Sequence, residues 1–288
     1  MTVSVSSEEF MNRKSNLFMI SLVWFTALAV SCHADELADK GRAIFKKNQH
    51  AVVTVQIVLK NKISMSGMGG QSSEARQDVT GTVLDSSGLT VLSLSATDPG
   101  QLLQNLMGGA DDESRVKVET ELSDVKILLD DGTELPAEVV LRDKDLDLAF
   151  IRPKARPATP MDFLDMSRAG KAELLEQVLS LNRLGNAAGR AYAASVERIS
   201  AIIQKPRLFY VPETSATMTS LGAPAFTLDG KPLGIFVLRA LKSRSSGGSG
   251  MLGMQQDSLA AIILPADDLL KAAKQVPPAA EEKEKKSE

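Results

Sequence analysis

This chain of 288 residues contains two histidines, His33 and His50, and a single cysteine, Cys32. Imidazole is the usual base that activates a serine nucleophile, because its unperturbed pKa lies near neutrality. His33 and Cys32 follow an apolar run near the N-terminus, and we expect His50 to be an exposed residue where the first strand begins. Because no histidine follows residue 50, the serines of the later sequence are without the base that nucleophilic catalysis normally uses.

Three alternating carboxylates, Asp143, Asp145 and Asp147, resemble the opening of a calcium-binding loop. Such a loop needs a glycine at its sixth position and a bidentate glutamate at its twelfth. Leu148 and Lys154 occupy those two positions. The pattern therefore predicts a turn that is followed by a strand, with one buried carboxylate, and no metal site.

Two further polar segments are best explained as loops. Asp111–Glu113 is acidic, which predicts a solvated loop, with a loose cation site as the alternative. Gly185–Arg190 is rich in small residues but lacks the strand-to-helix context and the Gly-Lys-Ser/Thr ending of a phosphate-binding loop. We expect it to join two strands, and we expect no cofactor.

Composition excludes a nucleic-acid partner, since the formal net charge is −3, the pI is about 5.6 and no basic stripe occurs. The chain is 43% hydrophobic but only 4% aromatic, so valine, leucine, isoleucine and alanine must supply the core. Its length allows one large or two small domains.

The N-terminus has the organisation of an export signal. Arg13 and Lys14 precede the apolar run Leu17–Val30, and small residues lead to Ala34. This run is shorter than the roughly 20 residues that a membrane-spanning helix needs. The pattern predicts a signal peptide over residues 1–34 with cleavage after Ala34, and a periplasmic or extracellular protein.

A lipoprotein signal that ends at Cys32 is the alternative. Cys32 would then be acylated and become the mature N-terminus, and this lipid would be the chain's contact with a membrane. Ala29 stands where that signal prefers leucine. Translation can start at Met1 or at Met11. A single cysteine excludes an intramolecular disulfide in either case.

Short β-branched runs bounded by turn residues fill most of the remaining sequence. We expect a helix at residues 35–48, a flexible loop at 63–73, an insertion loop at 97–120 and a closing helix at 265–276. Between these segments we expect strands at residues 52–59, 81–84, 89–94, 125–129, 134–141, 146–151, 177–181, 191–203, 207–211, 223–228, 233–238 and 259–264.

This pattern predicts an all-β fold of two six-stranded antiparallel β-barrels, with short N- and C-terminal helices. Residues 35–155 would form the N-terminal helix and the first barrel. Residues 156–276 would form a proline-rich linker, the second barrel and the closing helix. We expect the charged tail, residues 277–288, to be disordered.

Four segments together resemble trypsin-like serine proteases of the HtrA/Do type. Gly81–Ser95 is similar to the strand, turn and strand that lead to the catalytic histidine, and Val125–Ile151 is similar to the stretch that carries the catalytic aspartate. Thr219–Pro224 and Leu228–Ile235 resemble the Gly-Asn-Ser-Gly-Gly-Pro nucleophile loop and the strand after it. The resemblance covers about residues 48–276 and stops where PDZ domains usually follow in that family.

The resemblance implies a triad of which one member is present. Asp147 matches the aspartate, whereas Ser95 stands at the histidine position and Leu221 at the nucleophile position. Thr219, Ser220 and Leu221 are the equivalents of the oxyanion loop, which normally depends on glycine. An orienting aspartate alone does not activate a nucleophile.

The sequence leaves a displaced nucleophile formally open. Ser220 and Ser215 are the serines near the nucleophile position Leu221 in the sequence. Lys231 and Lys205 are the nearby lysines that could form a Ser–Lys dyad with one of them. No spacing supports either lysine.

These residues predict an exported, catalytically inactive pseudoprotease that binds a peptide or protein partner in the cleft between its barrels. The alternatives are an active serine endopeptidase with a non-standard site, and a structural envelope lipoprotein tethered through Cys32. The sequence does not decide whether the protein forms a homo-oligomer.

Overall fold

The computed structural model describes residues 36–65, 68–97, 116–213, 220–241 and 258–278. The chain divides into two units, residues 1–43 and 44–288. In the described part of the first unit, residues 36–43 are helical, and in the second unit residues 44–48 are helical. Among the described residues, no helix is long and apolar enough to cross a membrane.

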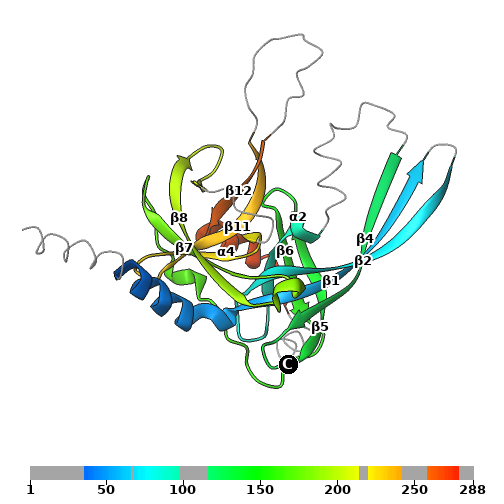
Figure 1. The fold of residues 1–288 in the computed structure, drawn as a ribbon, viewed down its shortest axis with the longest axis horizontal. Coiled ribbons are helices and arrows are strands. Elements are labelled where there is room, and N and C mark those ends of the chain that lie inside the picture. The colour runs from blue at the N-terminus through cyan, green and yellow to red at the C-terminus, as the bar shows by residue number, and fades with distance from the viewer. Residues whose placement is uncertain (1–35, 66–67, 98–115, 214–219, 242–257, 279–288) are drawn as a thin grey trace, which may run out of the picture. The chain divides into compact units, whose positions relative to one another are not determined.

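Six antiparallel strands close the first barrel in the order β1-β2-β3-β6-β5-β4 (Figure 1). The one-turn helix α2 (Leu94–Thr97) follows its third strand, and the 3-10 turn η1 (Gln49–Ala51) precedes its first. The strands are β1 (Val52–Met65), β2 (Met68–Val83), β3 (Thr90–Ser93), β4 (Val116–Leu128), β5 (Glu134–Asp143) and β6 (Leu148–Pro153).

The second barrel closes in the order β10-β11-β12-β9-β8-β7, also antiparallel. The helix α4 (Ala266–Ala273) follows its last strand, and the 3-10 turns η2 (Met166–Arg168) and η3 (Asn186–Ala188) lie before and after its first. The strands are β7 (Gln177–Arg183), β8 (Tyr192–Ile203), β9 (Phe209–Pro212), β10 (Pro224–Thr227), β11 (Pro232–Leu241) and β12 (Ser258–Pro265). The predicted fold, including the short terminal helices, is confirmed.

Alternation along β1 shows why these sequences form barrels. Val53, Val55, Ile57 and Leu59 are all at most 5% exposed, while the residues between them face the other side of the sheet. Burying each such side chain contributes about 1.5–3 kcal/mol. One buried cluster holds residues of both barrels, including Val55 and Leu92 of the first and Val178 and Phe236 of the second. The two barrels therefore share a core.

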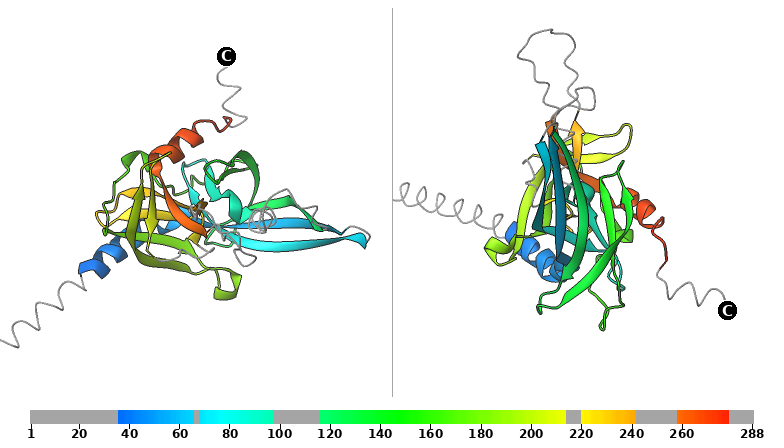
Figure 2. Two further views of the ribbon diagram at one scale, coloured as in Figure 1. Left: turned by 90° about the horizontal axis from the view of Figure 1, so that it is seen from above. Right: turned by 90° about the vertical axis from the view of Figure 1, so that its right-hand side faces the viewer.

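Two predicted loops are shorter than expected. Residues 63–73 are mostly strand, because β1 continues to Met65 and β2 begins at Met68. β1 pairs with β2 on one side and with β4 on the other along this length, so backbone hydrogen bonds hold a Gly- and Met-rich sequence in the β conformation despite its weak propensity. Figure 2 shows these strands (blue and cyan) extending together beyond the barrels.

The insertion loop predicted for residues 97–120 also ends early, because β4 begins at Val116. The same pairing with β1 extends this strand, since Val116 lies opposite Met65. Residues 98–115, with the acidic segment Asp111–Glu113, lie outside the described residues.

Candidate active site

Asp147 lies at the end of the turn between β5 and β6, where its backbone has a positive φ of 58°. Aspartate is among the residues that tolerate this left-handed conformation. The side chain of Asp143 forms the turn, because its Oδ1 accepts hydrogen bonds from the backbone N–H groups of Asp145 and Leu146, both at 3.0 Å. The alternating aspartates thus make a turn before a strand, as predicted.

The carboxylate of Asp147 accepts four hydrogen bonds. Its Oδ1 accepts from the backbone N–H and the Oγ of Ser95, both at 2.7 Å. Its Oδ2 accepts from the Oγ of Ser93 at 2.5 Å and from the backbone N–H of Leu238 at 2.8 Å. Because Leu238 belongs to β11, this carboxylate also joins the first barrel to the second.

Burial is the largest influence on the pKa of the Asp147 carboxyl group. Asp147 is only 8% exposed, and desolvation raises its pKa above the ordinary 3.8, although the bonds from Ser93, Ser95 and Leu238 act in the opposite direction. A carboxylate whose lone pairs already hold four donors is a poor base for a serine hydroxyl. Asp147 is therefore a well-anchored acceptor that orients no imidazole among the residues the structure describes.

Ser95 occupies the position where the sequence comparison expects a histidine. It lies in α2, two residues after the end of β3, and its hydroxyl takes the place on Asp147 that an imidazole N–H would need. Sequence reasoning missed Ser93, whose hydroxyl binds the other carboxylate oxygen. Its position at the end of β3, two residues before Ser95, is the signal that was available.

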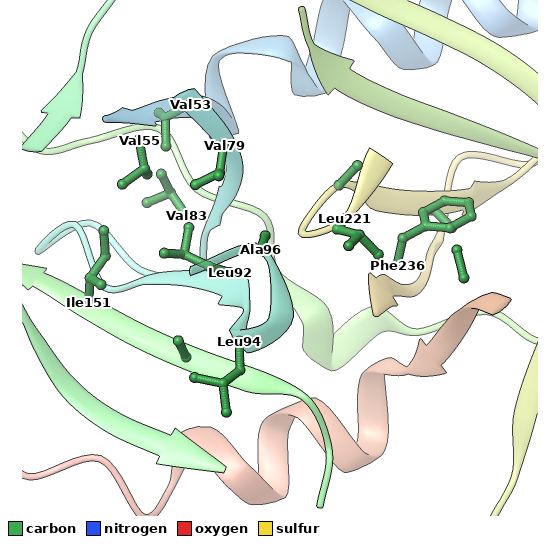
Figure 3. Close-up of a cluster of buried hydrophobic side chains, with 14 of the residues drawn as sticks. Val53, Val55, Val79, Val83, Leu92, Leu94, Ala96, Ile151, Leu221 and Phe236 are labelled. Atoms are coloured by element: carbon green, nitrogen blue, oxygen red, sulfur yellow. The ribbon is translucent and has the colours of Figure 1, made fainter. Parts of the chain in front are cut away.

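Leu221 is buried, with 1% of its surface exposed. It belongs to the same buried cluster as Leu92 and Ala96 of the first barrel and Phe236 of the second. Figure 3 shows Leu221 beside Phe236 and facing the segment that carries Leu92 and Ala96. The residue at the nucleophile position is thus an apolar core residue.

Gly222 has the one conformation in this loop that requires glycine. Its φ is +85°, and a Cβ there would lie 2.2 Å from the carbonyl oxygen of Thr80. The hydroxyl of Thr82 donates to the Gly222 carbonyl at 2.8 Å, and the Gly222 N–H donates to Phe236 at 2.8 Å. The loop is therefore packed tightly against β2 and β11.

The serines and lysines that could form an alternative catalytic pair are not brought together by the described structure. Ser220 is half-buried at the start of this loop, while Thr219 and Ser215 lie outside the described residues. Lys231 pairs with Asp229 at 2.6 Å. Lys205 is exposed. No described hydrogen bond links Ser220 to a base.

His50 has an exposed side chain (53%), as predicted, but it has an unforeseen partner. Its Nδ1 lies 2.9 Å from Oδ2 of Asp130, which follows β4. The imidazole therefore belongs to a different set of residues from Asp147. Gly185–Arg190 joins β7 to β8, also as predicted, and Arg190 Nε donates to Asp78 at 2.7 Å. Cys32 and His33 lie outside the described residues.

Comparison with known proteins agrees with the two-barrel fold. The family model described as "Trypsin-like peptidase domain" matches residues 48–235, which is more than half of the chain. No curated protein matches the chain.

Solved structures of HtrA-type and related proteases resemble the chain at low identity. The HtrA-type protease AlgW, as a variant with a decapeptide, has a TM-score of 0.52 and 14% identity, and the match covers 81% of this chain and 65% of that one. AlgW with a tripeptide gives 0.49 and 14%, with 81% and 62% covered. The protease domain of MamO from Magnetospirillum magneticum gives 0.48 and 13%, with 79% and 97% covered. This chain thus spans slightly less than two thirds of the AlgW chains, and the likeness bears on the fold alone.

Proposed function

This chain belongs to the trypsin-like peptidase domain family, and we propose that it is an exported pseudoprotease that binds peptide or protein partners between its barrels without cutting them. The state of the three triad positions carries the proposal. Ser95 is a hydrogen-bonded serine, Asp147 holds four donors, and Leu221 is buried in the core. No base and no nucleophile stand at the positions where the family's chemistry needs them.

Export is the part of the proposal that depends on the sequence alone. The basic residues before Leu17–Val30 and the small residues up to Ala34 support a cleaved signal, and Cys32 supports a lipid anchor as the alternative end of the same leader. Either end gives a periplasmic or extracellular protein.

The backbone of β11 supports peptide binding. This strand pairs with β12 from Gly234 to Leu241, but with β10 only from Pro232 to Ile235. Beyond Ile235, two N–H groups on the edge that faces away from β12 donate hydrogen bonds to other partners. The Phe236 N–H donates to the Ala223 carbonyl, and the Leu238 N–H donates to the Asp147 carboxylate. Alternate residues point to the same edge, so the N–H of Ala240 points there next. No described strand pairs with this edge at Ala240, so an extended peptide can add to it.

Binding of unstructured decapeptides to the purified full chain tests this function. We expect a subset of a fluorescent decapeptide library to bind and to be recovered uncut after prolonged incubation. Ala240→Pro removes the N–H on the free edge while leaving the pairing with β12, which uses the neighbouring residues. We expect this change to weaken peptide binding at least about tenfold, because one or two backbone hydrogen bonds are lost.

The matched control is Ala240→Ser, which keeps the N–H and should bind as the parent chain does. Fluorescence anisotropy measures affinity, and mass spectrometry of the recovered peptide detects cleavage. Equal affinity of both variants would place the bound peptide elsewhere, and cut peptide would contradict the pseudoprotease.

A further inference from the structure

A second group of charged and polar residues, His50, Asp130, Arg183 and Tyr192, joins the two barrels at a different place; we call it the Asp130 cluster. Asp130 lies in the turn after β4 and accepts hydrogen bonds from the other three. His50 Nδ1 lies at 2.9 Å, the Tyr192 hydroxyl at 2.5 Å and an Arg183 guanidinium N–H donor at 2.8 Å. Arg183 ends β7 and Tyr192, its cross-strand partner, begins β8, so a single carboxylate of the first barrel holds the two residues that flank the loop of a second-barrel hairpin.

Near neutral pH, Asp130 is ionised and Tyr192 is protonated. Partial burial by itself raises the pKa of Asp130, but the hydrogen bonds from Tyr192, His50 and Arg183 outweigh it and hold the pKa below 3.8. Burial and the Asp130 carboxylate raise the pKa of Tyr192, so its hydroxyl stays a donor. The Arg183 side chain is only 9% exposed, and its guanidinium lies 3.8 Å above the Tyr192 ring. An ionised carboxylate thus holds a nearly buried arginine in one orientation.

Thr80 connects this cluster to the candidate active site. The backbone N–H of Arg183 donates to the Thr80 hydroxyl at 3.2 Å, and the same hydroxyl donates to the Arg183 carbonyl at 3.3 Å. The carbonyl of the same threonine packs against Cα of Gly222, where a Cβ would meet it at 2.2 Å. Thr82, two residues further along β2, donates its hydroxyl to the Gly222 carbonyl. Two threonines of β2 therefore contact the second barrel, Thr80 at both Arg183 and Gly222 and Thr82 at Gly222.

We propose that the Asp130 cluster positions the loop Ser220–Gly222 through Arg183 and Thr80. Asp130 fixes the guanidinium of Arg183, Arg183 fixes Thr80 relative to the second barrel, and Thr80 with Thr82 sets where Gly222 can lie. The loop is joined to β11 in turn, because the Gly222 N–H donates to the Phe236 carbonyl and the Phe236 N–H donates to the Ala223 carbonyl. Arg183 and Asp130 are positioning residues in this account.

This inference rests on the proposed function in one respect, namely that the edge of β11, to which the loop is hydrogen-bonded, forms the peptide-binding site. Loosening the cluster should then weaken peptide binding from a distance. The position of the loop itself does not depend on any peptide, so it can be measured in the free protein.

Amide hydrogen exchange of the free full chain tests the positioning role. Asp130→Asn keeps the shape of the side chain but removes the charge that holds Arg183. We expect the exchange of the Gly222 and Phe236 amides to accelerate about tenfold, the effect of losing a charge-assisted hydrogen bond. Glu134→Gln is the matched control, since Glu134 lies on the same hairpin and pairs with Lys126 of its own barrel at 2.9 Å; both amides should exchange as in the parent chain.

A double-mutant cycle separates positioning from a general loss of stability. Thr80→Val removes the hydroxyl that meets Arg183, and we expect the same acceleration at Gly222. Asp130→Asn combined with Thr80→Val should be no faster than either alone, because both changes interrupt one connection. Thr80→Ser restores the hydroxyl and should restore slow exchange. This series remains informative if any single variant folds poorly.

Independent, multiplicative effects of Asp130→Asn and Thr80→Val on Gly222 exchange would overturn the inference. Unchanged exchange at Gly222 in Asp130→Asn would overturn it as well. Peptide affinity provides the separate readout. If exchange follows the prediction but Asp130→Asn binds decapeptide as the parent chain does, the positioning role stands and the proposed peptide site on β11 fails.

Discussion

Replacing Leu221 with serine should lower the free energy of unfolding by about 3–5 kcal/mol, because a buried leucine is lost and a hydroxyl is placed in an apolar site. Leu221 is 1% exposed and packs against residues of both barrels. Although this change restores the family's nucleophile in name, we expect no hydrolysis, even when it is combined with Ser95→His. The Asp147 carboxylate would still be held by Ser93 and Leu238.

Urea unfolding and a fluorogenic peptidase assay check this prediction. Leu174→Ser is the matched control, since Leu174 is 56% exposed, and it should change stability by no more than about 0.5 kcal/mol. A Leu221→Ser protein as stable as the parent chain, or one that hydrolyses peptides, would show that position 221 is an open site and not part of the core.

Asp147→Ala should also cost about 3–5 kcal/mol, because the change leaves the buried Ser93 hydroxyl and the half-buried donors of Ser95 and Leu238 unpaired and cuts a connection between the barrels. Asp145→Ala is the matched control in the same turn, where the side chain is exposed and accepts no described hydrogen bond. If the two variants unfold at the same urea concentration, Asp147 does not join the barrels.

The pH dependence of the same site has a defined sign. Since the folded-state pKa of Asp147 is raised above 3.8, the folded protein binds this proton more tightly than the unfolded chain does. Its contribution to stability is fully present below the unfolded pKa and is lost as pH rises through the folded value. Asp147→Asn keeps the left-handed turn and removes this titration. The stability difference between parent and variant should therefore favour the parent most near pH 3 and shrink towards pH 7.

Much of the fold is predictable from local patterns. β-branched alternation identified the strands, and the Asp-Gly and Ser-Gly turns divided them into hairpins, so the two barrels follow from period and turn chemistry. The long ends of β1, β2 and β4 were missed because their stability comes from pairing on both sides of β1. Composition alone made residues 63–73 look like a loop.

The site was predictable only at positions where segments of the sequence align, in chain order, with segments of a known family. Ser95, Asp147 and Leu221 were found by matching segments to a family, but their surroundings were not. Leu238 donates to Asp147 from 91 positions away in the sequence. His50 and Tyr192, which both contact Asp130, are 80 and 62 positions away from it. No local period carries such information, and the fold must be known before these groups can be paired.

We expect this trypsin-like chain to have no working nucleophile, and reaction with a fluorophosphonate tests this most directly. Such probes form a covalent bond only with a serine that a base activates. The intact mass of the purified full chain should be unchanged after prolonged incubation, under conditions in which an active trypsin-like protease is fully labelled. A stoichiometric adduct that disappears in Ser220→Ala would contradict the account and identify an active serine hydrolase.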